Sequence, residues 1–126
     1  MRHPLLVAAA AVSTLSIAAV PATAAIQAVT VTLSSYKYQP NPIQLVGGAR
    51  TELIFVNASG KSHNFVARTF FANAQIVDGS APGGAIELKA GERKTVTLIP
   101  RPGTYKVHCS HFGHDALGMK AGIVVE

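Results

Sequence analysis

The sequence contains a single cysteine, Cys109, among its 126 residues. One cysteine excludes an internal disulfide, although small secreted domains often depend on paired cysteines. It leaves three interpretations: a buried inert thiol, a link to a second chain, or a metal ligand. Several histidines and a methionine follow Cys109 closely in the sequence, and this neighbourhood favours the metal ligand.

Acidic residues and clustered basic residues are also scarce. The acids are Glu52, Asp78, Glu87, Glu92, Asp115 and Glu126. They form no constellation with a base that would indicate hydrolytic catalysis, so we do not expect an enzyme. The net charge of +5 is spread along the chain, which favours an acidic partner. Because no basic cluster is interleaved with aromatic residues, we expect no nucleic-acid binding.

Only one apolar stretch is long, and it lies at the N-terminus. Leu5 to Val20 carries no charge and is followed by the small residues Ala22-Thr23-Ala24. This pattern is typical of a secretory signal peptide cleaved after Ala24. A membrane anchor is the alternative, but the stretch is shorter than the ~20 apolar residues that a spanning helix needs. We therefore expect residues 1–24 to be a signal peptide, and residues 25–126 to be a single exported domain, in the periplasm or beyond it.

Most of the remaining chain is predicted to form short strands between glycine and proline turns. The predicted strands are Ile26–Leu33, Ile43–Val46, Thr51–Val56, His63–Ala67, Ala85–Leu88, Glu92–Ile99, Gly103–Cys109 and Lys120–Val125. About eight strands in a domain of this length indicate an all-β, antiparallel sandwich or barrel. Thr51–Val56 is apolar on both faces, so we expect it in the centre of a sheet. Thr69–Ile76 lacks strict alternation and is predicted to form one or two helical turns.

A soft ligand set lies near the C-terminus. Cys109, His114 and Met119 follow one another at the spacing Cys-x4-His-x4-Met. A thiolate, an imidazole and a thioether favour copper, and one cysteine, two histidines and a weak axial methionine are the ligands of a blue-copper site. The loop supplies only one of the two histidines, and His63 is the candidate for the other.

Two further histidines lie beside this ligand set. Alternation along the strand before the loop directs Val107 and Cys109 inward and His108 outward. His108 is therefore expected to be a solvated surface residue. His111 could replace a ligand through a Cys-x-His arrangement, but we expect it to be a loop histidine near the site.

Two blocks of sequence resemble the cupredoxins, the small blue copper proteins that include plastocyanin, azurin and rusticyanin. The first block comprises Tyr36–Gly48, Leu53–Asn57 and Ser62–Phe65; the second comprises Leu88–Gly91, Pro102–Tyr105, Cys109–Met119 and Ile123–Val125. Together they span nearly all of the chain after the signal peptide. The family often has a proline inside the ligand loop, where this chain has Phe112, and often a glycine two residues after the methionine, where this chain has Ala121.

The resemblance implies a Greek-key sandwich that holds one type 1 copper ion. Cys109 would form a short thiolate bond, His63 and His114 would complete a plane, and Met119 would be the long axial ligand. Asn64 would tie the two ligand segments together by hydrogen bonds.

The leading hypothesis is a one-electron carrier, a monomer that contacts redox protein partners transiently. The resemblance implies that one edge of His114 is exposed within an apolar patch, for which Phe112, Ala116 and Leu117 are available. A periplasmic copper chaperone or storage protein without redox cycling would use the same ligands. A zinc hydrolase is a third interpretation, but catalytic zinc requires an open coordination position.

We predict that the mature protein begins near Ala25, because signal peptidase cleaves after small residues such as Ala22-Thr23-Ala24. N-terminal sequencing of protein isolated from the cell envelope tests this. Finding intact Met1 as the main form in the cytosolic fraction would contradict the prediction.

Overall fold

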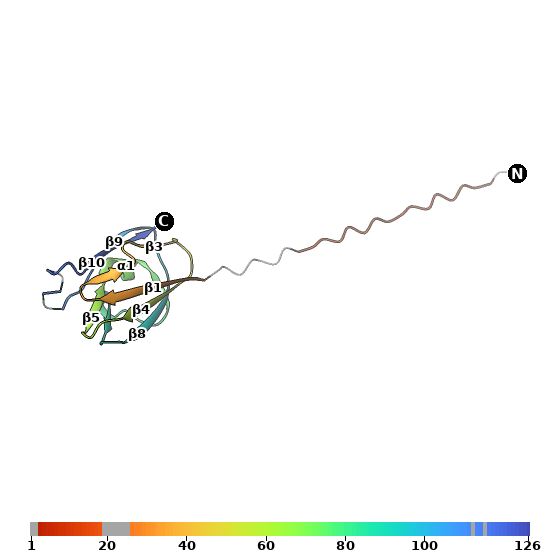
Figure 1. The fold of residues 1–126 in the computed structure, drawn as a ribbon. Coiled ribbons are helices and arrows are strands. Elements are labelled where there is room, and N and C mark those ends of the chain that lie inside the picture. Colours follow the sequence, from red (N-terminus) through yellow and green to blue (C-terminus); the bar gives the residue numbers. More distant parts are fainter. Residues whose placement is uncertain (1–2, 19–25, 112, 115) are drawn as a thin grey trace.

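The structure is a computed structural model, and it describes residues 3–18, 26–111, 113–114 and 116–126. Residues 3–18 form neither helix nor strand, and Figure 1 shows them extending away from the folded domain. The expected cleavage point after Ala24 lies outside the described residues. In the described part of the chain, no helix has the length and apolar character needed to cross a bilayer.

The described residues form two five-stranded sheets (Figure 1). The first sheet, in the order β2-β1-β4-β8-β6, consists of β1 (Gln27–Ser34), β2 (Lys37–Gln39), β4 (Thr51–Asn57), β6 (Gln75–Asp78) and β8 (Arg93–Ile99). The second, in the order β3-β10-β9-β5-β7, consists of β3 (Ile43–Leu45), β5 (His63–Val66), β7 (Ala85–Leu88), β9 (Gly103–His108) and β10 (Lys120–Val125). The expected all-β fold class is confirmed.

The core lies between the two sheets and follows the alternation of the strands. β4 alternates strictly, with Leu53 and Phe55 fully buried, and it occupies the centre of its sheet as expected. The rings of Phe55 and Phe65 meet across the two sheets, with centroids 4.8 Å apart. Burial of one such side chain contributes about 1.5–3 kcal/mol, so each of the two rings helps to hold the layers together.

Two strand pairings are parallel, which corrects the expectation of a purely antiparallel sheet. β1 pairs with β4 and β3 pairs with β10 in parallel register, while the other pairings are antiparallel. β1 and β2 form a hairpin, after which the chain crosses to the second sheet as β3 and returns as β4. The returning strand runs in the same direction as β1, so the pair is parallel.

The segment predicted as helical turns is only partly helical. α1 spans Arg68–Asn73 and buries Phe70 and Phe71, but the chain then forms strand β6 from Gln75. β6 pairs only with β8 at the sheet edge, and all of its residues are exposed. Without a buried face there is no apolar alternation that would indicate a strand. The strand β2 is also unpredicted, because three residues are too few to show a period.

Asn57 fixes the loop that leads into β5. Its side-chain amide donates hydrogen bonds to the backbone carbonyls of Lys61, Leu88 and Lys89 at 2.7, 3.2 and 3.0 Å. Its side-chain oxygen accepts hydrogen bonds from the backbone N–H and the hydroxyl of Ser59 at 3.0 and 2.8 Å. Asn57 is fully buried, so these partners replace water that cannot reach it.

We predict that Asn57→Ala lowers the free energy of unfolding by about 1–3 kcal/mol, because buried carbonyls and N–H groups lose their partners. Urea denaturation of the metal-free protein measures this. Ser59→Ala is the matched control, since it removes a hydroxyl from the partly exposed rim of the same network. An equal or larger loss in the Ser59 variant would mean that Asn57 is not the centre of the network.

Candidate metal centre

The sheet brings the predicted ligands to one end of the domain. His63 is the first residue of β5, Cys109 directly follows β9, and the loop to β10 carries His114 and Met119. β9 lies between β5 and β10, and His108 pairs with both Val66 and Lys120. Both β5 and β10 run antiparallel to β9. The start of β5, the end of β9 and the start of β10 therefore lie at the same end of this sheet.

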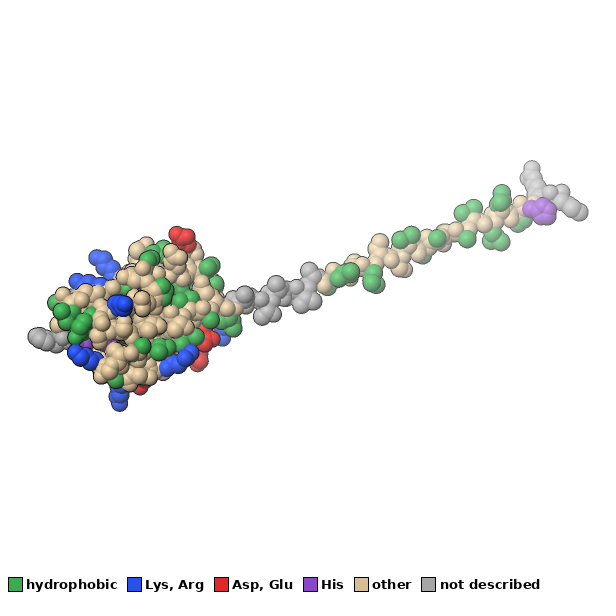
Figure 2. Space-filling model, in the orientation of Figure 1, with side chains coloured by type: hydrophobic (Ala, Val, Ile, Leu, Met, Phe, Trp, Pro, Cys, Tyr) green, Lys and Arg blue, Asp and Glu red, His purple; other side chains and the backbone are tan. Residues whose placement is uncertain are grey.

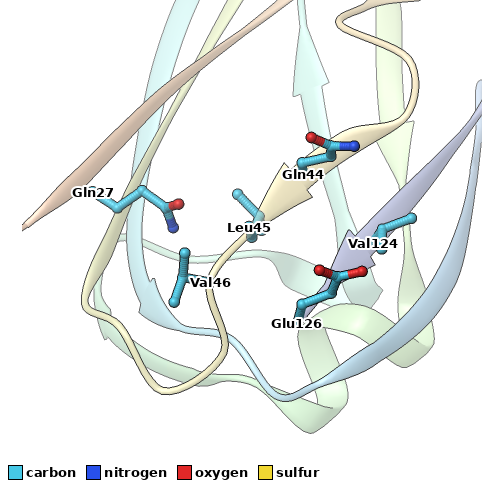
Figure 3. A pocket seen from close by; sticks show the side chains of 6 residues that line it. All are labelled: Gln27, Gln44, Leu45, Val46, Val124 and Glu126. Atoms are coloured by element: carbon cyan, nitrogen blue, oxygen red, sulfur yellow. The ribbon is translucent and has the colours of Figure 1, made fainter.

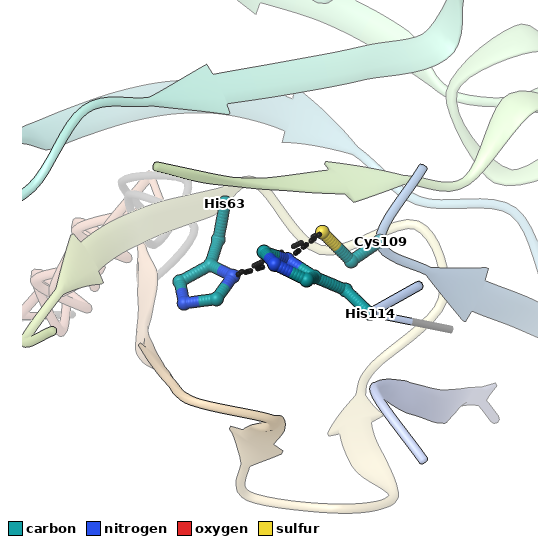
Figure 4. Close-up of side chains that lie close together, drawn as sticks. All are labelled: His63, Cys109 and His114. Atoms are coloured by element: carbon teal, nitrogen blue, oxygen red, sulfur yellow. Dashed lines mark hydrogen bonds between the residues drawn. The ribbon is translucent and has the colours of Figure 1, made fainter. Parts of the chain in front are cut away.

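Three donor atoms face one another at this end (Figure 4). Nδ1 of His63 lies 3.1 Å from Nδ1 of His114, and Sγ of Cys109 lies 4.0 and 3.6 Å from these two nitrogens. His63 and Cys109 are fully buried, and His114 is half-buried. Each residue thus directs its metal-binding atom into a common space.

The residues fit a copper ion of the type 1 class. A triangle with these sides leaves a point roughly 2 Å from each corner, comparable to the bond lengths of about 2.0–2.3 Å that metals form with imidazole nitrogen and thiolate sulfur. The donor set is two imidazoles and one thiolate with no carboxylate, which is the choice of soft ligands typical of copper.

The surroundings of His63 keep its imidazole neutral. Burial lowers the pKa of His63 below its ordinary value, and the nearby His114 and His111 lower it further. A neutral ring retains the lone pair that a metal needs, so no proton has to be displaced at neutral pH.

Met119 is placed beside Cys109 by the backbone. The Cys109 N–H donates to the Met119 carbonyl at 3.1 Å, and the Met119 N–H donates to the His114 carbonyl at 3.1 Å. Gly118 directs the chain into Met119 with φ = +90°, a conformation that residues with a Cβ rarely adopt. The Met119 side chain is fully buried, as the expected axial ligand would be.

Asn64 joins the two ligand segments, as the family resemblance implied. Its side-chain amide donates to the Ser110 hydroxyl at 2.7 Å, and the Ser110 N–H donates to the Asn64 side-chain oxygen at 2.8 Å. The hydroxyl of Tyr38 donates to the Asn64 carbonyl at 2.6 Å. Burial raises the pKa of Tyr38, and the nearby Cys109 raises it further, so the hydroxyl keeps the proton that it donates.

The turn between β1 and β2 also contacts the site, and sequence reasoning missed this. The Ser35 hydroxyl lies 3.1 Å from Nε2 of His63. The Tyr36 ring meets His63 and His114 edge-on, with centroid separations of 6.2 and 5.0 Å. The sequence positions of Ser35 and Tyr36 follow no metal-ligand spacing. Their contacts with the site become visible only when the fold packs this turn against β5.

His111 and His108 lie where the sequence placed them, outside the ligand cluster. His111 bonds through Nε2 to the carboxylate of Glu87, and its ring stacks on His114 at 5.7 Å. It is therefore a hydrogen-bonded loop residue that covers one face of His114. His108 is half-exposed and alternates with the buried Val107.

Part of the expected apolar patch can be located. Ala116 and Leu117 are exposed beside His114, and the Leu117 side chain is 60% exposed. Phe112, the third residue expected in the patch, lies outside the described residues. The half-buried His114 and the exposed Leu117 together give this end of the domain an apolar surface next to a candidate ligand.

Basic side chains do not concentrate at any single place on the face shown in Figure 2. Lysine and arginine occur there at several separate positions, in agreement with the spread of charge along the sequence.

A surface pocket lies at the opposite end of β10 from the ligands (Figure 3). Its lining residues are Gln27, Gln44, Leu45, Val46, Val124 and Glu126. β10 begins directly after Met119 and ends beside this pocket, so the length of the strand separates the two. Glu126 is the only titratable side chain in its lining, and the pocket adds nothing to the metal centre.

Comparison with known proteins agrees with the fold. The family described as "Cupredoxin-like domain" matches residues 5–125, so the chain belongs to the cupredoxin-like family. Auracyanin B has a similar structure, with 28% sequence identity, a TM-score of 0.59, and coverage of 85% of this chain and 93% of auracyanin B.

A second similar structure is the dithionite-reduced auracyanin of the photosynthetic bacterium Roseiflexus castenholzii. It has 21% identity and a TM-score of 0.61, and the match covers 79% of this chain and 97% of that one. At this identity the similarity supports the fold alone. No curated protein sequence matches the chain.

Proposed function

We propose that the protein is an exported, mononuclear type 1 copper protein that carries single electrons between protein partners. His63, Cys109, His114 and Met119 are its ligands. The observation that carries the proposal is the convergence of two imidazole nitrogens and the only thiol in the chain within 4.0 Å at a buried point.

Bound copper supplies a one-electron couple between Cu(I) and Cu(II). The protein keeps the donor atoms in place, because His63 starts a strand and Cys109 directly follows one. The bonds between Asn64 and Ser110 prevent the two segments from separating. Little then has to move when the charge of the site changes, which is the property that rapid electron transfer requires.

Burial favours the carrier over a copper chaperone or storage protein. A chaperone hands its ion to another protein, which requires donors that the recipient's ligands can reach. Here Cys109, His63 and Met119 are fully buried, and only His114 is half-exposed. An electron can pass through the edge of His114, whereas ligand exchange at the thiol would require the loop to open.

The same geometry gives little support for an enzyme. The donor cluster contains no carboxylate, and Glu87 beside it is hydrogen-bonded to His111.

We propose that the partners of this carrier dock transiently at the end of the domain formed by His114 and Leu117. Export to the periplasm is part of the proposal and rests on the N-terminal signal alone.

We predict that the copper-loaded wild-type protein is blue and that Cys109→Ala is colourless with Cu(II), because the colour arises from charge transfer between the thiolate and copper. His114→Ala should lose the same band. His111→Ala should remain blue, since His111 bonds to Glu87 and lies outside the donor triangle.

Visible absorption spectra of the three variants and the wild type measure these outcomes, with copper content determined in parallel. His108→Ala is a further control, because its ring lies on the other face of the strand from Cys109. If His111→Ala bleached the band and His114→Ala retained it, the ligand assignment would be wrong.

We predict that Met119 sets the reduction potential rather than retaining the metal. Met119→Gln offers a harder oxygen donor that favours Cu(II), so the potential should fall. Met119→Leu removes the axial donor and leaves Cu(II) less stabilised than Cu(I), so the potential should rise. Each shift should reach about 59 mV or more, a tenfold change in equilibrium constant for one electron.

Cyclic voltammetry of the two variants decides this, with copper content measured for each. Loss of copper from both variants, or an unchanged potential in both, would show that Met119 is not the axial ligand.

A further inference from the structure

His63 makes contacts at both of its ring nitrogens. Nδ1 faces the donor triangle, and Nε2 lies 3.1 Å from the hydroxyl of Ser35. His63 is fully buried, whereas Ser35 is exposed in the turn between β1 and β2. The Ser35 hydroxyl thus stands between the far side of the imidazole and the solvent.

The two nitrogens of a neutral imidazole have different hydrogen-bonding roles. One carries a proton and donates, while the other has the lone pair and accepts. If Nδ1 of His63 binds a metal, Nε2 must carry the proton, and a buried N–H needs an acceptor. Among the described residues, the hydroxyl of Ser35 is the acceptor that the structure provides for Nε2.

A serine hydroxyl can both accept and donate a hydrogen bond, so its own proton also needs an acceptor. Because Ser35 is exposed, its proton can point to water while its oxygen accepts from Nε2. This direction agrees with the tautomer that leaves Nδ1 free for the metal. The opposite tautomer would place a proton inside the donor triangle.

The turn that carries Ser35 is fixed against the site. Ser34 pairs with Lys37 across the hairpin, which leaves Ser35 and Tyr36 as a two-residue turn. The Tyr36 ring packs on His114, and Nζ of Lys61 donates to the Tyr36 hydroxyl at 3.1 Å. The position of the Ser35 oxygen is therefore set by contacts on the neighbouring residues and does not depend on Ser35 alone.

We propose that Ser35 is a positioning residue of the metal centre. Its hydroxyl accepts the Nε2 proton of His63, holds the ring in one orientation and maintains the tautomer in which Nδ1 is free to bind metal. This inference rests on the proposed function, since it assumes that His63 is a ligand. The β1–β2 turn is then a third segment of the site, beside β5 and the ligand loop.

Three variants test the proposal. Ser35→Ala removes the acceptor, and Ser35→Thr keeps a hydroxyl at the same position. Ser34→Ala is the matched control, because the Ser34 hydroxyl is buried one residue earlier and has no hydrogen-bond partner among the described residues. Far-UV circular dichroism and thermal unfolding of the metal-free proteins check that each variant folds.

The first measurement is the affinity for Zn(II), a redox-inert probe, in competition with a chelator. We expect Ser35→Ala to bind roughly tenfold to a hundredfold more weakly, the loss typical of removing the hydrogen-bond partner of a ligating histidine. The zinc affinities of Ser35→Thr and Ser34→Ala should stay close to that of the wild type.

The second measurement is the tautomer of His63 in the metal-free protein, from two-bond ¹H–¹⁵N correlation spectra. The Nε2–H form should predominate in the wild type and decline in Ser35→Ala.

Unchanged zinc affinity and an unchanged His63 tautomer in Ser35→Ala would overturn the inference. An equal loss of affinity in Ser34→Ala would also overturn it, because the effect would then belong to the turn and not to the hydroxyl of Ser35. Failure of the proposed function is a separate result, since it would appear as a wild-type protein without the blue band when loaded with Cu(II).

Discussion

The arrangement of the donor atoms depends on the two hydrogen bonds between Asn64 and Ser110. Each of these residues directly follows a candidate ligand, His63 in one case and Cys109 in the other. The bonds therefore fix the separation of the two ligands through the backbone, before any metal is present. The bond from the Cys109 N–H to the Met119 carbonyl fixes the other end of the loop in the same way. Such a site is preorganised, and the cost of ordering it is met during folding rather than during metal binding.

The sequence predicted the buried part of the fold well and the exposed edges poorly. Strands such as β4 and β9 bury alternate residues, and this period is visible in the chain. β6 has no buried residue, and β2 is only three residues long, so neither leaves a pattern. The parallel pairing of β1 with β4 was also not predictable from local sequence, because it depends on the path of the chain through the second sheet.

The candidate site was also predicted only in part: the ligand candidates were predicted, and the residues that support them were not. The residue types and spacing of Cys109, His114 and Met119 indicated the chemistry directly, and the donor atoms of His63, Cys109 and His114 do converge. The contacts of Ser35 and Tyr36 could not be predicted, since serine and tyrosine occur in many turns and nothing in their spacing refers to His63. Their role arises only when the β1–β2 hairpin is packed against β5. Residues that support a ligand are harder to predict from sequence than the ligand itself, because many residue types can provide such contacts.

The uneven burial of the donors has a consequence for how long the protein keeps its metal. Among the described ligand candidates, only His114 reaches the surface, with His111 stacked on one face of its ring and Tyr36 against its edge. On the proposed function, electrons pass at His114, and copper leaves only when the loop that carries His114 opens. A redox partner docked over His114 therefore also closes the route by which copper leaves, so a carrier engaged with its partner exchanges metal more slowly than a free one.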